Sequence, residues 1–449
     1  MDEGISNTDT RTGRVADSGT AGHAAALKPG DELTLSPTTM AHGGEAIAHA
    51  PDGRVVFVSG AIPGDTARVT LTKVKKNWAR GEATSIEQAS PDRVDPVCPA
   101  AAAGAGCCDY SHITPAAQER LKREILVGQL DKFARPSGVL DGFDIAIDLE
   151  QNTLSPLTGW RTRTRLGVGE DGRAGMRQSR SHDVIAGVRC TQVNQEALDG
   201  VVGPDARLFT PGAELVVVVD SRGKRHVVET QRAQRGKRIE HIETRIEGDA
   251  AVTEAVPAPA GSEVEEAVFR FPPTAFWQAH TTAPATYCRY IAEWAQDTYA
   301  RPVGWDLYGG AGLFVPHISD VLGSGAHVVS VDYSAAATRD PQPALDNLDV
   351  EVRNQKVEAS IDGLPDPGLV VLDPPRTGAG AEVVQAVAAR APQRAIHIGC
   401  DPATFARDLA AWGEAGYVVE RMALIDAFPN THHFEVLTSL VPAVSATDE

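Results

Sequence analysis

The N-terminal part of the chain alternates apolar and polar residues over short runs. Segments such as EAIAHAPDGRVVFVSG and GDTARVTLTKVKKNWARGEATSI, both within residues 31–90, have the two-residue period that is typical of strands. The tripeptide PDG at 51–53 stands between two apolar runs and indicates a hairpin turn. Several short strands without a helical period predict a small β-barrel over residues 30–90.

The middle of the chain combines one helix with many strand-like runs. Residues 116–134, AAQERLKREILVGQLDKFA, carry apolar residues at helical spacing and predict an amphipathic helix. From residue 140 to 270 β-like runs dominate, among them RTRTRLGVG and ELVVVVDSRGKRHVVET. We therefore predict a β-rich central domain over residues 91–270, which begins with a connector rich in Pro, Ala and Cys.

After Phe271 the pattern changes to apolar runs that are separated by helical stretches. The runs GWDLYGGAGLF, HVVSVD, LVVLDPP and RAIHIGC alternate with helical segments, one of which is expected at about 282–299. Strands alternating with helices are typical of a doubly wound parallel sheet. We predict an α/β domain of this kind over residues 271–449.

Residues 1–29 are predicted to be a disordered tail. They are polar, alternately charged and rich in Gly, Ala, Thr and Asp, and they lack the apolar region of a signal peptide. No apolar run in the chain approaches the roughly 20 residues that a membrane span needs. The expectation is therefore a cytoplasmic protein without a membrane partner.

The formal net charge of -18 argues against a simple basic nucleic-acid coat protein. Binding depends on local patches, however, and three basic stretches interrupt the acidic chain. The first surrounds Trp78 and fits a surface that contacts phosphates and stacks a base, although an edge strand kept soluble by lysines explains it equally well. The second contains Arg161, Arg163 and Arg165, which alternate along one predicted strand and therefore share one of its faces. The third lies within residues 222–238.

A glycine-rich loop and two acidic residues follow successive strands of the predicted α/β domain. The loop DLYGGAGLF at 306–314 lets the backbone turn tightly and approach a ligand closely, but it lacks the G-K-[ST] of a phosphate-binding P-loop. Asp332 ends the next strand, where an acid can bind ribose hydroxyls, and Asp373 ends a third strand in LVVLDPPRTGAG. Because ligands bind beyond the carboxyl ends of such strands, we expect a site for a nucleoside-containing cofactor here.

One of the six cysteines, Cys400, lies between a predicted strand and a predicted helix in RAIHIGCDPATFARDL. Asp401 is the expected N-cap and Pro402 the first helical residue, so the helix N-terminus favours a thiolate at Cys400. The alternative is a small buried hydrophobic residue. Glu435 lies in an apolar strand, where alternation alone favours a surface position; if buried, it would suit general-base catalysis.

Five motifs in this order resemble the S-adenosylmethionine-dependent RNA uracil-C5 methyltransferases, the tRNA and rRNA 5-methyluridine enzymes. They are FWQAH, DLYGGAGLF, LDPPRTG, GCDPATFARDL and FPNTHHFE, and the resemblance covers roughly residues 31–441. It implies a Rossmann-like class I methyltransferase domain with a doubly wound sheet. This domain would be preceded by a small OB-like β-barrel, the TRAM RNA-binding module, and by a β-rich central domain.

The resemblance also implies roles for individual residues. Cys400 matches the nucleophile of the family's S/G-C-N/D-P turn, and Glu435 matches the base. The positions that match the family's contacts to S-adenosyl-L-methionine are Gln278, Tyr308, Asp332 and Asp373.

Three positions depart from the family pattern. Asp401 stands where the family usually has Asn and places a negative charge beside the thiol. His280 replaces the usual Asn after the glutamine, and Leu313 replaces an Asn in the glycine loop, so it is not expected to contact the cofactor.

The cysteine connector departs most from the family. Many members hold a [4Fe–4S] cluster with C-x5-C-x2-C and a distant fourth cysteine. Here CPAAAAGAGCCDYSH keeps Cys98 and Cys108, Ala105 takes the middle ligand's place, and Cys107 is adjacent to Cys108. Cys190 matches the distant ligand. Four thiols remain available as metal ligands, but vicinal cysteines are awkward ligands for one cluster, so its presence and its absence both stay open.

The sequence thus predicts methylation of uridine C5 in structured RNA, with rRNA favoured over tRNA, by a chain expected to be a monomer. Uracil C5 is a poor nucleophile; addition of a thiolate at C6 makes an enolate that can accept the methyl group, and a base then removes the C5 proton. Two alternatives are a non-catalytic RNA-binding protein on a degenerate methyltransferase fold, and a DNA or protein methyltransferase. The latter would use the Asp-Pro-Pro loop to hold an amino group.

Overall fold

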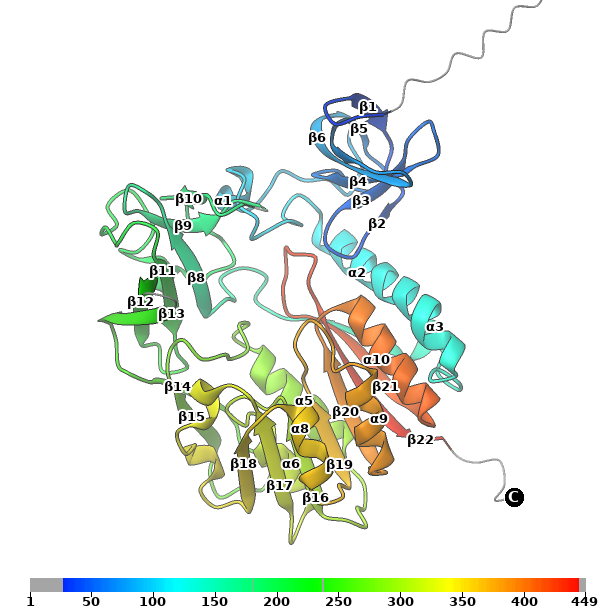
Figure 1. Cartoon of the computed structure of the whole chain (residues 1–449), viewed down its shortest axis with the longest axis vertical. Helices are drawn as coiled ribbons and strands as arrows, with labels where there is room; N and C mark the ends of the chain where they lie inside the picture. The colour runs from blue at the N-terminus through cyan, green and yellow to red at the C-terminus, as the bar shows by residue number, and fades with distance from the viewer. Residues whose placement is uncertain (1–26, 180, 236–237, 444–449) are drawn as a thin grey trace, which may run out of the picture.

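The computed structural model describes residues 27–179, 181–235 and 238–443, and it divides into three parts (Figure 1). A β-barrel lies at the top of the view, a β-rich central domain at the left and an α/β domain below. Residues 1–26 of the predicted disordered tail lie outside the described residues. No helix in these ranges combines the length and the apolar character needed to cross a membrane.

The barrel confirms the strands and the hairpin that were predicted from the alternating pattern. Neighbouring strands follow the order β1-β5-β6-β4-β3-β2, and the PDG turn joins β3 to β4. Along β5 the buried residues Ala67, Val69 and Leu71 alternate with exposed ones, because every second side chain enters the core. The strands are β1 (Glu32–Leu35), β2 (Thr39–Met40), β3 (Ala46–His49), β4 (Val55–Ser59), β5 (Thr66–Val74) and β6 (Trp78–Gln88).

A short helix, α1 (Pro99–Ala102), and a long one, α2 (Pro115–Gln129), follow the barrel. Thr114 and Pro115 begin α2, and a wide turn at Leu130–Ala134 continues it, so the predicted helix at 116–134 is confirmed. The apolar face of α2 packs against the α/β domain, and the short helix α3 (Ile145–Asp148) comes next.

The central domain is built on an antiparallel sheet with the order β10-β9-β8-β11-β12-β13. A separate hairpin of β14 and β15 leads from this sheet towards the α/β domain (Figure 1). The elements are β8 (Arg163–Val168), β9 (Ala174–Arg177), β10 (Val184–Ala186), α4 (Gln195–Leu198), β11 (Glu214–Val219), β12 (Arg225–Arg235), β13 (Arg238–Glu247), β14 (Val252–Pro257) and β15 (Glu266–Phe271).

The α/β domain contains the predicted doubly wound sheet, with the order β18-β17-β16-β19-β20-β22-β21-β7. Only β22 runs antiparallel to its neighbours β20 and β21 in the described sheet. The strands are β16 (Val303–Leu307), β17 (His327–Asp332), β18 (Val350–Asn354), β19 (Leu369–Leu372), β20 (Arg394–Gly399), β21 (Tyr417–Asp426), β22 (Glu435–Pro442) and β7 (Leu149–Thr153). The helices are α5 (Ala283–Trp294), α6 (Val315–Leu322), α7 (Ala335–Thr338), α8 (Val357–Ser360), α9 (Ala381–Ala389) and α10 (Pro402–Glu414).

One part of the predicted central domain belongs to the α/β domain instead. Strand β7 pairs in parallel with β21 at the edge of the sheet of the α/β domain, and α2 packs on α10. The predicted range of 91–270 thus contains a strand of that sheet. Strand β21 lies far from β7 in the chain, and the residue pattern of a short strand does not predict which distant strand it pairs with.

Candidate active site

The glycine loop joins β16 to α6 and bends sharply back over the edge of the sheet. Tyr308 has a φ of 61°, and a Cβ added to Gly309 would lie 2.2 Å from Oδ2 of Asp306. Only glycine fits there, because the loop passes directly over that buried carboxyl group. Burial raises the pKa of Asp306 to about 7, although Ser330 donates a hydrogen bond to it. The tightness of this turn fixes the position of the loop.

Asp332, at the end of β17, holds the glycine loop in place by accepting hydrogen bonds. The Gly310 N–H donates to Oδ2 of Asp332 at 3.0 Å, and the Ser334 N–H donates to Oδ1. A cavity of about 320 Å³ adjoins this point and is lined by Gly310, Gly312 and Ser330, among others. Glycine backbone, a carboxylate at a strand end and an adjoining cavity together fit a nucleoside-containing ligand such as S-adenosyl-L-methionine.

Asp373 follows β19 and contacts Gln278, which precedes α5. The Gln278 side-chain amide donates to Oδ2 of Asp373 at 3.1 Å. Burial raises the pKa of Asp373 to about 7, despite that hydrogen bond. The structure thus brings together two of the residues that the resemblance assigned to the cofactor.

Cys400 lies at the turn from β20 to α10, where the sequence predicted it. Asp401 is the N-cap and accepts hydrogen bonds from the N–H groups of Ala403 and Thr404 at 3.0 and 2.9 Å. These N–H groups are therefore not directed at the thiol. Burial raises the pKa of Cys400 to about 12, and the carboxyl groups of Glu435 and Asp373 add to the effect. The expectation that the helix terminus favours a thiolate is wrong for this state of the protein.

Glu435 begins β22 directly opposite the turn that carries Cys400. Gly399 pairs with Val436 across the antiparallel strands, which places Cys400 beside Glu435. The Glu435 side chain is buried, and its Oε2 has no hydrogen-bond partner among the described residues. The surface position that alternation alone favoured is therefore wrong, because β22 is an inner strand of the sheet. Burial raises the pKa of Glu435 well above its usual value, and Asp373 raises it further.

Two further residues near these groups were not among the sequence-predicted site residues. Arg376, from the LDPPRTG motif, lowers the pKa of both Cys400 and Glu435 by its positive charge and lies 3.2 Å from the His433 ring. Tyr287 of α5 is fully buried near Glu435 and Asp373, and its hydroxyl has no partner within the described ranges. Arg376 could have been taken from its motif, whereas Tyr287 looks like any core residue of a helix.

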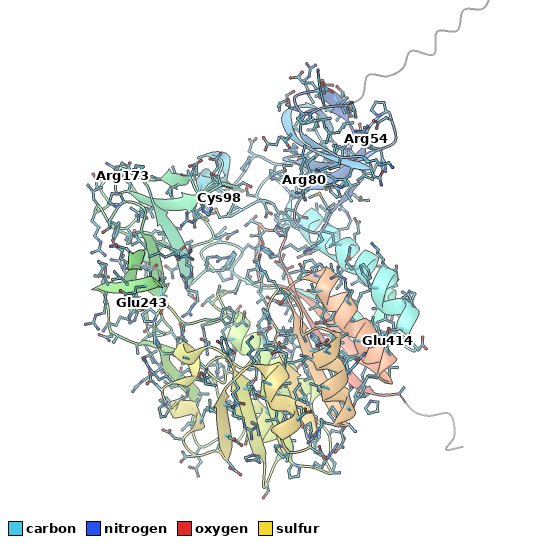
Figure 2. The ribbon with its side chains drawn as sticks, in the orientation of Figure 1. Arg54, Arg80, Cys98, Arg173, Glu243 and Glu414 are labelled. Carbon is cyan, nitrogen blue, oxygen red and sulfur yellow. The ribbon has the colours of Figure 1, made fainter. Side chains whose placement is uncertain are left out.

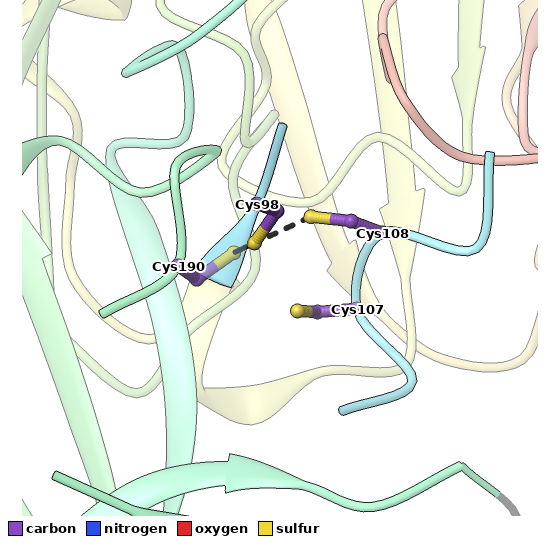
Figure 3. Close-up of side chains that lie close together, drawn as sticks. All are labelled: Cys98, Cys107, Cys108 and Cys190. Carbon is purple, nitrogen blue, oxygen red and sulfur yellow. Dashed lines mark hydrogen bonds between the residues drawn. The ribbon is translucent and has the colours of Figure 1, made fainter. Parts of the chain in front are cut away.

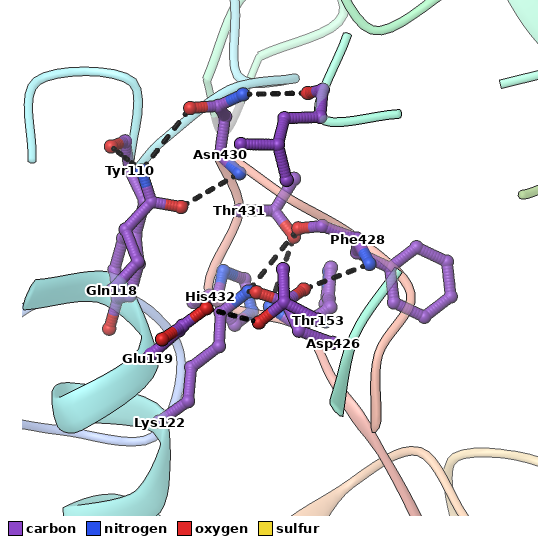
Figure 4. Close-up of polar contacts among 12 residues, drawn as sticks. Tyr110, Gln118, Glu119, Lys122, Thr153, Asp426, Phe428, Asn430, Thr431 and His432 are labelled. Atoms are coloured by element: carbon purple, nitrogen blue, oxygen red, sulfur yellow. Dashed lines mark hydrogen bonds and ion pairs between the residues drawn. The ribbon is translucent and has the colours of Figure 1, made fainter. Parts of the chain in front are cut away.

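The loop before Glu435 is held by the connector and by α2 (Figure 4). The Asn430 N–H donates to the Gln118 side chain at 2.8 Å, and the His432 N–H donates to Asp109 at 3.0 Å. At the start of this loop, Lys122 and Asp426 form an ion pair of 2.7 Å with both side chains buried. Residues more than 300 positions apart in the chain thus place the start of β22.

A cavity of about 520 Å³ opens between the central and the α/β domains. Arg161, Arg163 and Arg165, which were predicted to share one face, all line it, together with Arg376 and the exposed ring of Phe276. The cavity carries several cations and an exposed aromatic ring, which are features that suit a phosphate backbone and an unstacked base.

Two of these three arginines are paired with acids, and the third lies over a ring. Arg163 donates to Glu254 at 2.9 Å and Arg165 to Glu214 at 2.7 Å. The guanidinium of Arg161 lies 4.8 Å from the Trp160 ring, and its Nε has no partner in the described part of the chain. The Nε of Arg163 also has no partner among the described residues, so Arg161 differs from the other two arginines in having no ion pair with an acid there.

The barrel carries its own basic and aromatic surface. Lys73 and Arg80 each lie 5.7 Å from the Trp78 ring, while Lys75 and Lys76 are exposed in the adjoining turn. Arg80 lies on the barrel and Cys98 on the connector that follows it (Figure 2). The barrel also contacts the turn that carries Cys400, because Nε2 of His42 lies 2.7 Å from Oδ2 of Asp401.

His280 and Leu313, the two other departures from the family pattern, are both buried. The His280 ring stacks on Trp160 with the ring centroids 5.4 Å apart, and burial lowers its pKa to about 4. Leu313 belongs to the apolar core that covers one face of the sheet. Both residues serve packing, so neither disrupts the groups around Cys400.

The four cysteines of the connector and central domain converge (Figure 3). Cys98, Cys107, Cys108 and Cys190 have their sulfur atoms within 4.8 Å of one another. All four are free thiols rather than disulfides. This spacing is too short for a [4Fe–4S] cluster, in which each thiolate binds a different iron and the sulfur atoms lie roughly 6 Å apart.

Comparisons with known proteins identify the family of this chain. Residues 366–441 match the family model described as tRNA (Uracil-5-)-methyltransferase, and residues 27–84 match the TRAM domain. An RNA methyltransferase of Corynebacterium glutamicum is 46% identical over 417 residues, covering 92% of this chain and 97% of that relative. One of Corynebacterium efficiens is 47% identical over 417 residues, covering 92% and 95%.

Among solved structures, the tRNA (uracil-54, C5)-methyltransferase of Pyrococcus abyssi in complex with S-adenosyl-L-homocysteine has the same fold. It is 18% identical with a TM-score of 0.62, covering 92% of this chain and 100% of that one. The close relatives are RNA methyltransferases, which sets aside the alternatives of a non-catalytic RNA-binding protein and of a DNA or protein methyltransferase. The chain therefore belongs to the S-adenosylmethionine-dependent RNA uracil-C5 methyltransferases and carries a TRAM domain.

Proposed function

We propose that this protein methylates C5 of a uridine in structured RNA through a covalent bond between Cys400 and uracil C6. The observation that carries the proposal is the position of Cys400, which lies beside the buried Glu435 at the carboxyl edge of the sheet. The Asp373–Gln278 pair and the glycine loop follow neighbouring strands at the same edge. A nucleophile, a base and a nucleoside-binding loop are thus within one site.

In this proposal Gln278, Tyr308, Asp332 and Asp373 hold the cofactor. S-adenosyl-L-methionine supplies a methyl group on a positively charged sulfur. The left-handed backbone at Tyr308 and the hydrogen bond from Gly310 to Asp332 shape the loop against the 320 Å³ cavity. Asp373, fixed by Gln278, lies between this loop and Cys400, where it can orient the reacting groups.

The reaction requires a series of bond changes at these residues. The Cys400 thiol loses its proton to solvent, and its sulfur forms a bond to C6 while the C5=C6 π electrons move towards the uracil O4. C5 then forms a bond to the methyl carbon of the cofactor as the methyl–sulfur bond breaks, which would leave the cofactor as a neutral thioether. Glu435 removes the proton that remains on C5, after which the C6–S bond breaks and the C5=C6 bond reforms. The raised pKa of Glu435 makes its carboxylate a stronger base for that step.

The RNA substrate is proposed to enter through the arginine-lined cavity. Paired bases hide their faces, so the target uridine must be unstacked or lie in a loop before C6 can reach the thiol. Arg161, Arg165 and Phe276 offer charge and a stacking surface at the entrance, and the barrel adds a second basic surface around Trp78. We favour rRNA over tRNA because this separate RNA-binding module suits a large, structured substrate.

An adduct with RNA that contains 5-fluorouridine tests the mechanism. Fluorine at C5 cannot leave as a proton, so the covalent complex should accumulate in the wild type and survive denaturing electrophoresis. Cys400→Ala should form no such complex, while Cys288→Ala, which removes a buried thiol of α5, should form it normally. A covalent complex that persists in Cys400→Ala would overturn the proposal. Mapping 5-methyluridine in rRNA and tRNA after loss of the gene would identify the substrate.

A further inference from the structure

The four cysteines come from separate parts of the chain and enclose a small volume. Cys98 is the N-cap of α1, Cys107 and Cys108 follow that helix, and Cys190 lies between β10 and α4. Figure 3 shows the adjacent side chains of Cys107 and Cys108 extending to the same side, towards the other two thiols. Cys98, Cys108 and Cys190 are buried and Cys107 is half-buried. Thiols gathered in this way are typical of metal ligands rather than of core packing.

The distances between the sulfur atoms distinguish one metal ion from a cluster. Cys190 Sγ lies 3.8 Å from Cys98 Sγ and 3.6 Å from Cys108 Sγ, and no pair of the four exceeds 4.8 Å. Four thiolates around one zinc ion, with Zn–S bonds of about 2.3 Å in a tetrahedron, lie about 3.8 Å from one another. The observed spacing therefore matches a single tetrahedral ion and leaves no room for four irons and four sulfides.

The backbone around the thiols is held independently of them. The Gly106 N–H donates to the carbonyl of Arg177 at 3.0 Å, which attaches the connector to the central sheet. The Gln192 side chain donates to the carbonyl of Cys107 at 2.7 Å, and the Gln195 side chain donates to that of Cys190 at 3.3 Å. These bonds orient the ligand-bearing segments, as outer contacts do in metal sites.

We propose that Cys98, Cys107, Cys108 and Cys190 bind one zinc ion in tetrahedral thiolate coordination, in place of the [4Fe–4S] cluster of the family. On binding, the thiols release their protons to solvent. The ion joins the connector to the central domain. It also supports the active site, because Asp109 follows Cys108 and accepts a hydrogen bond from the His432 N–H in the loop before Glu435.

Metal analysis of the full chain, purified without oxygen and without chelators, tests this proposal. We expect about one zinc per chain, no acid-labile sulfide and no visible absorption. Cobalt(II) taken up by the metal-depleted protein should give the intense visible bands of a tetrahedral cobalt thiolate, and zinc should displace it. Four irons with acid-labile sulfide and a broad visible band would overturn the proposal, as would a chain that takes up no metal.

Two cysteine variants show which thiols bind the ion. Cys107→Ala should lose the zinc or bind it far more weakly, whereas Cys288→Ala should retain it, because Cys288 lies in α5 outside the four-cysteine site. If Cys107→Ala fails to fold, the cobalt spectrum of the wild type still decides the case. Equal zinc retention in both variants would contradict the assigned ligand set. These readouts do not depend on the methylation reaction, so the proposed function can fail while the zinc site stands.

Discussion

Three ionisable side chains, Cys400, Asp373 and Glu435, share one buried region at the ends of β19, β20 and β22. Burial raises the pKa of all three. The negative charge of Asp373 raises the pKa of Cys400 and Glu435 further, that of Asp332 does so for Asp373, and Arg376 opposes the rise for Cys400 and Glu435. The raised pKa of Cys400 favours its thiol form at neutral pH, so the proposed attack by its sulfur would require loss of that proton. The sequence placed Cys400 at a helix terminus, but its local pattern did not show that Asp373 and Glu435 would raise the pKa of the thiol, because they come from other strands.

The pH dependence of Cys400 alkylation tests this raised pKa. With a pKa of about 12, the thiolate fraction should rise about tenfold for each pH unit from 7 to 10, whereas an ordinary thiol levels off near pH 9. Asp401→Asn should lower the pKa and speed alkylation, because it removes a neighbouring negative charge yet can still cap α10. Iodoacetamide labelling followed by mass spectrometry measures both rates. A plateau near pH 9 in the wild type would contradict the prediction.

Replacement of Glu435 tests whether this residue removes the C5 proton. Glu435→Gln should still form the bond to C6 and accept the methyl group, but it should not remove the C5 proton. The methylated covalent complex should therefore accumulate with ordinary uridine RNA, and turnover should fall by about 10²–10⁴-fold. Denaturing electrophoresis with labelled methyl donor measures the complex. Normal turnover without a trapped complex would exclude Glu435 as the base.

At the scale of elements, the local pattern predicted most strands and helices but not all of their partners. The period of two gave the barrel strands, and the alternation after Phe271 gave the order of strands and helices in the catalytic sheet. Strand β7 and helix α2 nonetheless pack on β21 and α10, far along the chain. A buried Lys122–Asp426 ion pair fixes this packing, and neither residue alone differs from a surface residue in the sequence.

Removal of one member of that ion pair should strongly destabilise the protein. Lys122→Met leaves Asp426 buried without its counter-charge, which costs about 3–5 kcal/mol. As a control on the same helix, Arg120→Ala breaks a 2.8 Å ion pair with Asp92 that is exposed to solvent and should cost under about 1 kcal/mol. Chemical denaturation of both variants measures the difference. Equal losses would mean that the buried pair does not hold α2 in place.

At the scale of the whole molecule, the barrel is continuous with the catalytic domain. One apolar core includes Val56 of the barrel, Leu121 of α2 and Trp412 of α10. The barrel also reaches the catalytic turn through His42 and Asp401. Burial of Asp401 raises its pKa, but the hydrogen bonds from His42 and the Thr404 backbone outweigh this and lower it to about 2. The TRAM domain is thus in direct contact with the residue next to Cys400.

Loss of this contact should be measurable at the thiol. In His42→Ala, Asp401 keeps its negative charge without the imidazole, so Cys400 alkylation should slow by about two- to tenfold and methylation should fall with it. His49→Ala, an exposed histidine of the same barrel, serves as the control. The double variant His42→Ala/Asp401→Asn should match Asp401→Asn alone, because the two residues act through one interaction. Identical rates for His42→Ala and His49→Ala would show that the barrel does not influence the nucleophile.

The sequence by itself determined the barrel, the doubly wound sheet, the glycine loop and the place of Cys400 at the start of a helix. Each of these depends on residues close together in the chain, where periodicity, caps and turns act. Only the tertiary structure decided the burial of Glu435, the raised pKa of the thiol, the partners of β7 and α2, and the spacing of the four cysteines. Those properties arise from charges, strands and sulfur atoms that approach one another across long stretches of chain, and no local pattern of residues encodes such distances.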